Sequence, residues 1–252
     1  MQNLRICWNN LWDSGTLTFN SEETNFLASR TQHRWATKCY RATGDAAEWL
    51  KLDTGLVNPG IQAFILKISN FTDAATTTLE LNAADAWGGP TYSEILTPDT
   101  SIMVHFPTSA QNLRWSRFTM ADGANPDTYV RVGRIFLGAY WSPTINFTRQ
   151  YRKTPVDPSL ITFSEGGQIS SIQRTHYTEY VYAFKRMSAA DKASLEAIFA
   201  DRGLAKDFFV CQDADGVLTT TTYQARFAKN IVYDHVIRDE QFDVVIYVEE
   251  LR

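Results

Sequence analysis

The sequence predicts a mainly β protein with two units. The first is an N-terminal β-sandwich of jelly-roll type, and the second is a C-terminal antiparallel β-sandwich or barrel with one flanking α-helix. Three observations lead to this fold class: short stretches of apolar alternation recur along the chain, turn-forming residues separate them, and one helix alone has clear start and stop signals.

The first unit is expected to consist of short strands joined by loops rich in Gly, Pro, Asn and Asp. Ile61–Ile68 is almost continuously apolar, which is typical of a strand covered on both faces, and the other strands alternate. Ser21–Ala28 is the one segment here whose pattern suggests a short helix. The remaining predicted strands are Thr77–Ala83, Ile102–Phe106, Leu113–Phe118 and Tyr129–Leu137.

The second unit contains the clearest helix of the chain, expected over residues 188–202. Ser188 can cap it, and the Asp191 carboxylate three residues later suits the positive end of the helix dipole. Gly203 supplies the stop. The apolar stripe consists of Leu195, Ile198 and Phe199. Strands are expected near residues 168–175, 177–186, 207–212, 222–228, 230–238 and 242–250.

The tryptophans divide the chain, because all seven lie within the first 141 residues. Pro143, Pro155 and Pro158 interrupt regular structure just after the last of them. We therefore expect a jelly roll at residues 1–143, a linker at 144–158 and a second β unit at 159–252.

The composition excludes several classes of protein. Hydrophobic residues at 44% and charged residues at 21% are typical of a globular chain, and a net charge of −4 argues against nucleic acid as a partner. The longest strongly apolar run, Val244–Val248, is too short for membrane insertion. Residues 1–13 lack the apolar centre of a signal peptide, and the three cysteines form no metal-ligand pair. We therefore expect synthesis in a reducing cytosol.

No catalytic residue, cofactor site or metal site is assigned from the sequence. It has no Gly-x-Ser-x-Gly elbow, phosphate loop or dinucleotide fingerprint, and its four histidines are isolated. Asp213-Ala-Asp215-Gly216 is interpreted as a hairpin turn, because the glutamate that would close a calcium loop is missing. Glycosidase carboxylates come from distant strands and leave no local signature. The expectation of a non-enzyme therefore rests on the absence of the other catalytic motifs.

Two aromatic residues are candidates for contact with a glycan. Trp87 and Tyr92 flank the loop Gly88-Gly89-Pro90, and aromatic rings on loops can stack against sugar rings. The alternative, which the burial of large rings favours, is that the tryptophans fill a core or a subunit interface. We expect Trp49 and Trp115, within predicted strands, to be shielded, and Trp87 to be the most exposed tryptophan.

The first unit resembles the galactose-binding-like (discoidin-type) jelly rolls across residues 1–143. The resemblance lies in Glu48–Gly55 (EWLKLDTG), Arg114–Phe118 (RWSRF) and Tyr129–Gly138 (YVRVGRIFLG). It implies a jelly-roll fold and a glycan on the host surface as a partner. The family's paired terminal cysteines are missing, and its sugar-binding residues vary too much to be carried over to this chain.

The second unit is similar to the β-sandwich-plus-helix module of tail tube and distal tail proteins of tailed bacteriophages. The similar segments are Tyr182–Asp213 and Val244–Leu251. The resemblance implies a homo-oligomeric ring in which strands of neighbouring subunits continue one another. It also implies other phage tail proteins as partners, and a place in the virion at the tail tip or baseplate after assembly in the host cytoplasm.

Together these observations predict a structural, non-enzymatic component of a phage tail tip or baseplate. Its second unit would build an oligomeric collar, and its jelly roll would decorate that collar or dock neighbouring tail proteins. The alternative is a carbohydrate-binding module that attaches to host-surface glycans. An accessory domain of an enzyme is a third interpretation.

Overall fold

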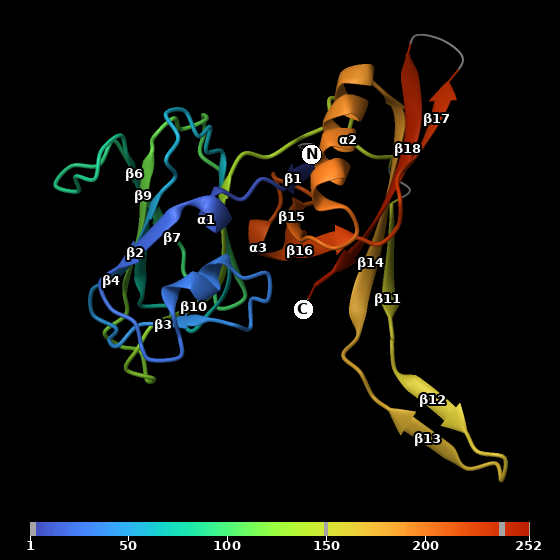
Figure 1. Ribbon diagram of the computed structural model, residues 1–252, viewed down its shortest axis with the longest axis horizontal. Coiled ribbons are helices and arrows are strands. Elements are labelled where there is room, and N and C mark those ends of the chain that lie inside the picture. Colours follow the sequence, from blue (N-terminus) through green and yellow to red (C-terminus); the bar gives the residue numbers. More distant parts are fainter. Residues whose placement is uncertain (1–3, 149–150, 237–239, 252) are drawn as a thin grey trace. The chain divides into compact units, whose positions relative to one another are not determined.

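The structure is a computed structural model that describes residues 4–148, 151–236 and 240–251. It is mainly β, with antiparallel sheets, as the sequence predicts (Figure 1). The chain divides into two compact units, each of which is described by itself. The first consists mainly of Arg5–Trp141 with Cys211–Thr222, and the second mainly of Ser142–Val210 with Tyr223–Arg252.

The first unit is a β-sandwich of two antiparallel sheets. The four-stranded sheet has the order β3 (Tyr40–Arg41), β10 (Arg131–Gly138), β5 (Ala63–Ser69) and β8 (Ile102–His105). The five-stranded sheet has the order β2 (Thr16–Phe19), β4 (Glu48–Asp53), β9 (Trp115–Ala121), β6 (Thr76–Asn82) and β7 (Tyr92–Leu96).

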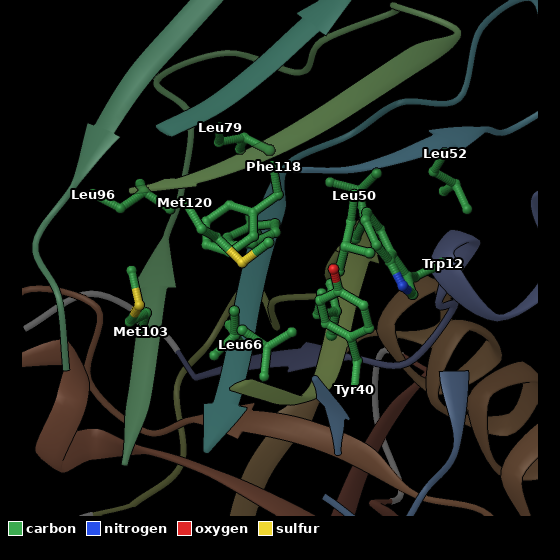
Figure 2. Close-up of a cluster of buried hydrophobic side chains, with 14 of the residues drawn as sticks. Trp12, Tyr40, Leu50, Leu52, Leu66, Leu79, Leu96, Met103, Phe118 and Met120 are labelled. Atoms are coloured by element: carbon green, nitrogen blue, oxygen red, sulfur yellow. The ribbon is translucent and has the colours of Figure 1, made fainter. Parts of the chain in front are cut away.

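The core of this unit lies between the two sheets (Figure 2). Leu50 of β4 and Phe118 and Met120 of β9 are buried, and so are Phe64 and Leu66 of β5 from the opposite sheet. The rings of Phe64 and Phe118 meet with their centroids 5.2 Å apart. This apolar contact between the sheets supplies the main stabilisation of the sandwich, because burial of apolar area is the dominant favourable term in folding.

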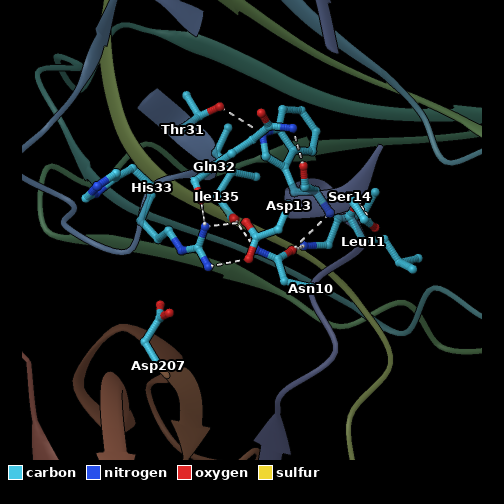
Figure 3. Close-up of polar contacts among 12 residues, drawn as sticks. Asn10, Leu11, Asp13, Ser14, Thr31, Gln32, His33, Ile135 and Asp207 are labelled. Atoms are coloured by element: carbon cyan, nitrogen blue, oxygen red, sulfur yellow. Dashed lines mark hydrogen bonds and ion pairs between the residues drawn. The ribbon is translucent and has the colours of Figure 1, made fainter. Parts of the chain in front are cut away.

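A polar network attaches the helical segments of this unit to β10 (Figure 3). Asn10 caps the first helix, and its Nδ2 donates to the Ile135 carbonyl at 2.8 Å. Arg134 is only 2% exposed, and its guanidinium donates to both the Asp13 carboxylate, at 2.7 Å, and the Gln32 carbonyl, at 2.6 Å. A buried cation needs such partners. The short elements of the unit are β1 (Arg5–Cys7), α1 (Leu11–Ser14), η1 (Ala28–Gln32) and α3 (Leu218–Thr221).

The prediction of a helix at Ser21–Ala28 is wrong. The Ala28 N–H donates to the Glu22 carboxylate at 2.9 Å, and the Glu23 N–H donates to the Arg41 carbonyl at 2.9 Å. These two bonds hold the segment as a loop beside β3, and helical structure, of 3-10 type, begins only at η1.

The second unit is built on one antiparallel sheet with a separate hairpin. The predicted strands are found, although residues 237 and 238 of the segment 230–238 lie outside the described residues. The expected linker at 144–158 contains the strand β11 (Arg152–Val156), which pairs with β14 (Tyr177–Met187). Within this unit the strands of the sheet have the order β15 (Phe208–Cys211), β16 (Thr222–Phe227), β18 (Gln241–Glu250), β14 and β11. In addition, β17 (Val232–Val236) pairs with β18. The hairpin is β12 (Leu160–Phe163) with β13 (Ile169–Ile172).

The helix α2 (Ala189–Arg202) follows its sequence signals. The Ser188 hydroxyl accepts from the Asp191 N–H at 3.1 Å, and Gly203 ends the helix with a φ of +53°. Leu195 and Ile198 are buried. The Phe199 ring packs edge-on against Phe227 of β16, with centroids 5.3 Å apart. Within the described parts of the chain, no helix has the length and apolarity needed to cross a bilayer.

We predict that α2 is a packing element. Leu195→Ala is expected to lower the free energy of unfolding by about 2–5 kcal/mol, because it leaves a cavity under a fully buried side chain. Ser188→Ala is expected to cost about 1 kcal/mol through the lost cap. Urea denaturation measures both, with the exposed Glu196→Ala as control at roughly 0.5 kcal/mol or less. A Leu195→Ala variant as stable as the control would show that the helix is not docked.

Candidate functional site

The outer surface of the five-stranded sheet carries an aromatic and charged face. Along β4 and β9 buried residues alternate with half-buried ones, so one side of each strand belongs to the core and the other to the outer surface. Trp49 and Lys51 of β4 lie on the outer side, and so do Trp115 and Arg117 of β9. We call these four residues, together with Asp85 and Trp87 of the loop between β6 and β7, the tryptophan face.

Lys51 lies at the centre of the tryptophan face. Its Nζ is 5.0 Å from the ring centroid of Trp49 and 6.0 Å from that of Trp115, within the range of cation–π attraction. The same ammonium donates to both oxygens of Asp85 at 2.9 Å. Asp85 in turn accepts from the indole Nε1 of Trp87 at 2.5 Å. One cation and one carboxylate therefore link all three tryptophans.

Arg117 connects the loop tryptophan to the sheet. Its guanidinium carbon lies 4.7 Å from the ring centroid of Trp87, and its Nε donates to the Glu80 carboxylate of β6 at 2.6 Å. Arg117 is the register partner of Lys51 on β4 and of Glu80 on β6. The two neighbouring cations thus each have a carboxylate partner, which offsets the repulsion between them.

A depression of about 240 Å³ opens on this side of the sheet. Trp49 and Arg117 belong both to its lining and to the tryptophan face. The volume is somewhat below the roughly 300 Å³ at which pockets for drug-sized ligands begin, so it suits a small unit of a longer ligand. The other lining residues are Ala47, Glu48, Thr76, Thr119, Met120 and Ala121.

Asp85 and Asp53, two carboxylates at the tryptophan face, remain ionised in mildly acidic solution. Hydrogen bonds from Lys51, and then from Trp87, lower the pKa of Asp85. Asp53, at the end of β4, receives two hydrogen bonds from the Arg114 guanidinium at 2.6 and 2.7 Å, and these lower its pKa. Each carboxylate is therefore an acceptor that keeps its charge.

The structure places the two sequence candidates on opposite sides of the sheet. Trp87 lies over Arg117 on the outer side. Tyr92 pairs with the buried Leu81 and packs against the core, and its hydroxyl lies 2.5 Å from Nε2 of His105. Burial raises the pKa of Tyr92 and lowers that of His105. The two aromatic rings therefore do not form one site.

The expected exposure of the tryptophans needs correction. Trp87 is half-buried by its contacts with Arg117 and Asp85, and Trp35, at 42%, is more exposed. Trp49 and Trp115 lie within strands as predicted, but they are half-buried on the outer side and not in the core.

Sequence reasoning missed Lys51, Asp85 and Arg117. For Lys51 a local signal existed, since it alternates with Leu50 and Leu52 and so shares the solvent side with Trp49. Asp85 lies 34 residues from Lys51, and no spacing rule connects them. Within the described ranges, no cluster of three or more His, Cys, Asp or Glu residues could hold a metal ion.

Comparisons with known proteins find similarity only among solved structures. No protein-family model and no curated protein matches the chain. A fucose-binding module of Streptococcus pneumoniae has 6% identity and a TM-score of 0.43, over 53% of this chain and 99% of that one. A family 32 carbohydrate-binding module of C. perfringens NanJ, solved with galactose, has 8% identity and a TM-score of 0.43, over 55% and 99%.

A third similar structure is chitosan-binding module 1 from a chitosanase/glucanase of Paenibacillus sp. IK-5. It has 19% identity and a TM-score of 0.41, over 52% of this chain and 99% of that one. These similarities give the expected relation to phage tail proteins no support.

We predict a pH-dependent change at Trp87. Because the folded pKa of Asp85 is lowered, its bonds to Lys51 and Trp87 contribute fully above the unfolded value of about 3.9 and are lost as the pH falls through the lower folded value. The emission of Trp87, taken as the difference between the protein and its Trp87→Phe variant, should therefore change with a midpoint below about 3.9.

The variant Lys51→Met serves as the comparison, because it removes the first cause of the shift and should raise that midpoint. A midpoint at or above the ordinary aspartate value in the unmodified protein would contradict the arrangement described here.

Proposed function

We propose that the first unit is a carbohydrate-binding module and that the tryptophan face is its binding site. The observation that carries this proposal is the presence of three tryptophans on the solvent side of one sheet, linked through Lys51 and Asp85. None of the three fills the core, which consists of aliphatic and aromatic residues on the inner side of the strands.

The indole rings offer the apolar contact that a sugar ring needs. A sugar that covers roughly 50 Å² of one indole gains about 1 kcal/mol at roughly 25 cal/mol per Å². Trp49 and Trp115 lie on strands and face Lys51, so their side chains are already restricted and little entropy is lost on binding. The ion pairs of Lys51 and Arg117 restrict their long side chains in the same way before the ligand arrives.

Hydroxyl groups of a saccharide would find partners around these rings. A carboxylate offers about four lone-pair sites, and Asp85 uses only some of them for Lys51 and Trp87. Thr119 lines the depression next to Trp49, its register partner, and adds a hydroxyl. The combination of flat apolar rings and fixed polar groups is typical of small-ligand sites.

Binding without catalysis is part of the proposal. A glycosidase needs one carboxyl group with a raised pKa that donates a proton to the leaving oxygen. Asp53 and Asp85 both have lowered pKa values because of their cationic partners. These two groups are therefore suited to accept hydrogen bonds from a sugar and not to protonate it.

We predict that the tryptophan face determines glycan binding. Trp49→Ala and Trp87→Ala should each weaken retention on a glycan array about fivefold, the equivalent of the roughly 1 kcal/mol gained from one indole. Both should leave the melting temperature nearly unchanged, because the residues are only half-buried on the outer side.

Trp35→Ala is the matched control, since Trp35 is exposed and lies outside the tryptophan face. Its glycan binding should equal that of the unmodified chain. Glycan binding that survives both Trp49→Ala and Trp87→Ala would refute the proposed site.

A second candidate function is favoured by the hairpin β12–β13. The chain would then be a structural component of a phage tail tip or baseplate, assembled in the host cytoplasm into a homo-oligomer with other tail proteins. β11 and β14 lead into the hairpin (Figure 1), and every residue of its two strands is exposed. A two-stranded hairpin is marginally stable alone, so one that carries large apolar side chains is suited to pack against another chain.

The register of the hairpin distributes these apolar side chains over both of its faces. Leu160 pairs with Ile172 on one face, and Phe163 pairs with Ile169 on the other. Phe163 is 71% exposed and Ile169 is 67% exposed. A partner that covered both faces would enclose the hairpin. Several copies of the chain in one assembly could do so.

We predict that the hairpin mediates self-association or assembly with tail proteins. The double variant Phe163→Asp with Ile169→Asp should reduce the particle mass measured by light scattering across a wide concentration range, because it buries charge in the contact. Val57→Asp, at an 85% exposed position of the first unit, is the control. An unmodified chain that stays monomeric and fails to join co-expressed tail proteins would exclude this second function.

A further inference from the structure

We infer that the tryptophan face selects uncharged saccharides over acidic ones. This inference rests on the proposed function, since it names the ligand class of the same site. Its basis is the balance of charges around the three indoles and the way in which the cations are already bound.

The charges on this side of the sheet form pairs. Lys51 donates to Asp85 at 2.9 Å, and Arg117 donates to Glu80 at 2.6 Å. At the end of the sheet Arg114 donates twice to Asp53, at 2.6 and 2.7 Å. Three cations thus meet three carboxylates, and no excess of positive charge remains among these six groups to attract an anionic ligand.

The charged groups of the two central cations also lie against indole rings. Lys51 lies within 5.0 Å of the Trp49 ring centroid and 6.0 Å of the Trp115 centroid, and Trp87 lies over the guanidinium of Arg117 at 4.7 Å. A carboxylate or sulfate on a sugar would have to break an existing ion pair or lie beside a carboxylate. Either change disfavours an acidic ligand.

The carboxylates favour a ligand rich in hydroxyl groups. Asp85 and Asp53 keep their charge in mild acid, because hydrogen bonds from their cationic partners lower their pKa values. An ionised carboxylate is only an acceptor, and a sugar hydroxyl is a donor to it. An uncharged saccharide can therefore bind while all three ion pairs stay intact.

The test uses the full chain on a glycan array that holds matched pairs, each with and without a sialic acid, sulfate or uronic acid group. Calorimetry on the best-bound pair then gives the ratio of dissociation constants. We expect the uncharged member to bind at least tenfold more tightly. Asp85→Asn should reduce this ratio severalfold, because it leaves the charge of Lys51 unbalanced, and Glu80→Gln should do the same through Arg117.

Asp73→Asn is the control, since Asp73 is an exposed carboxylate that belongs neither to the tryptophan face nor to the lining of the depression, and its ratio should match the unmodified chain. Equal or tighter binding of the acidic members to the unmodified chain would overturn the inference and leave carbohydrate binding intact. If no glycan of either class is retained, the proposed function fails and the inference with it. A selectivity unaltered by both Asp85→Asn and Glu80→Gln would also overturn it.

Discussion

The strict alternation of β4 and β9 between core and solvent is the constraint on which the first unit depends. Leu50 and Leu52 of β4 are fully buried together with Phe118 of β9, so the residues between them must face outward. A slip of one residue would bring Lys51 and Arg117 into the apolar interior, at a desolvation cost that the sandwich does not tolerate. The packing of the core therefore determines that Trp49 and Trp115 lie on the outer side of the sheet.

The two candidate functions support one another physically. A face that holds one or two sugar rings gains only a few kcal/mol, and association itself consumes part of that gain. An oligomer that presents several copies of the same weak site to one surface binds far more tightly, because the first contact raises the effective concentration of the others. If both proposals hold, the exposed hairpin β12–β13 would bring copies together, and each copy would contribute one tryptophan face as a sugar site.

The sequence predicts those elements whose signals are local. The helix α2 could be placed because Ser188 and Gly203 define its ends, and β18 because its apolar residues alternate from Phe242 to Val248. The edge strands β2 and β7 were missed, since most of their residues are exposed and carry no apolar period. β11 was missed because its burial pattern is almost entirely exposed and it contains Pro155, which is tolerated at the edge of a sheet.

The candidate site was only partly predictable for a related reason. Trp87 could be recognised from the loop around it, but its neighbours come from strands that are distant in sequence. The bond between Lys51 and Asp85 depends on the register of β4, β9 and β6, which no single segment encodes. Tyr92 was placed beside Trp87 by proximity in sequence, whereas the pleat of β7 turns it to the other side of the sheet.

The loop at residues 83–91 divides the tryptophan face into a permanent part and an exchangeable part. Trp49, Lys51, Trp115 and Arg117 lie on strands whose other side forms the core, so the core fixes the positions of their backbone. The loop meets no such restriction: a side chain added at Gly88 or Gly89 would touch nothing within 4 Å. Insertions or replacements in this one loop could therefore change which ligand is recognised while the sandwich stays the same. The loop is for this reason the natural place for variation among related chains and for engineering.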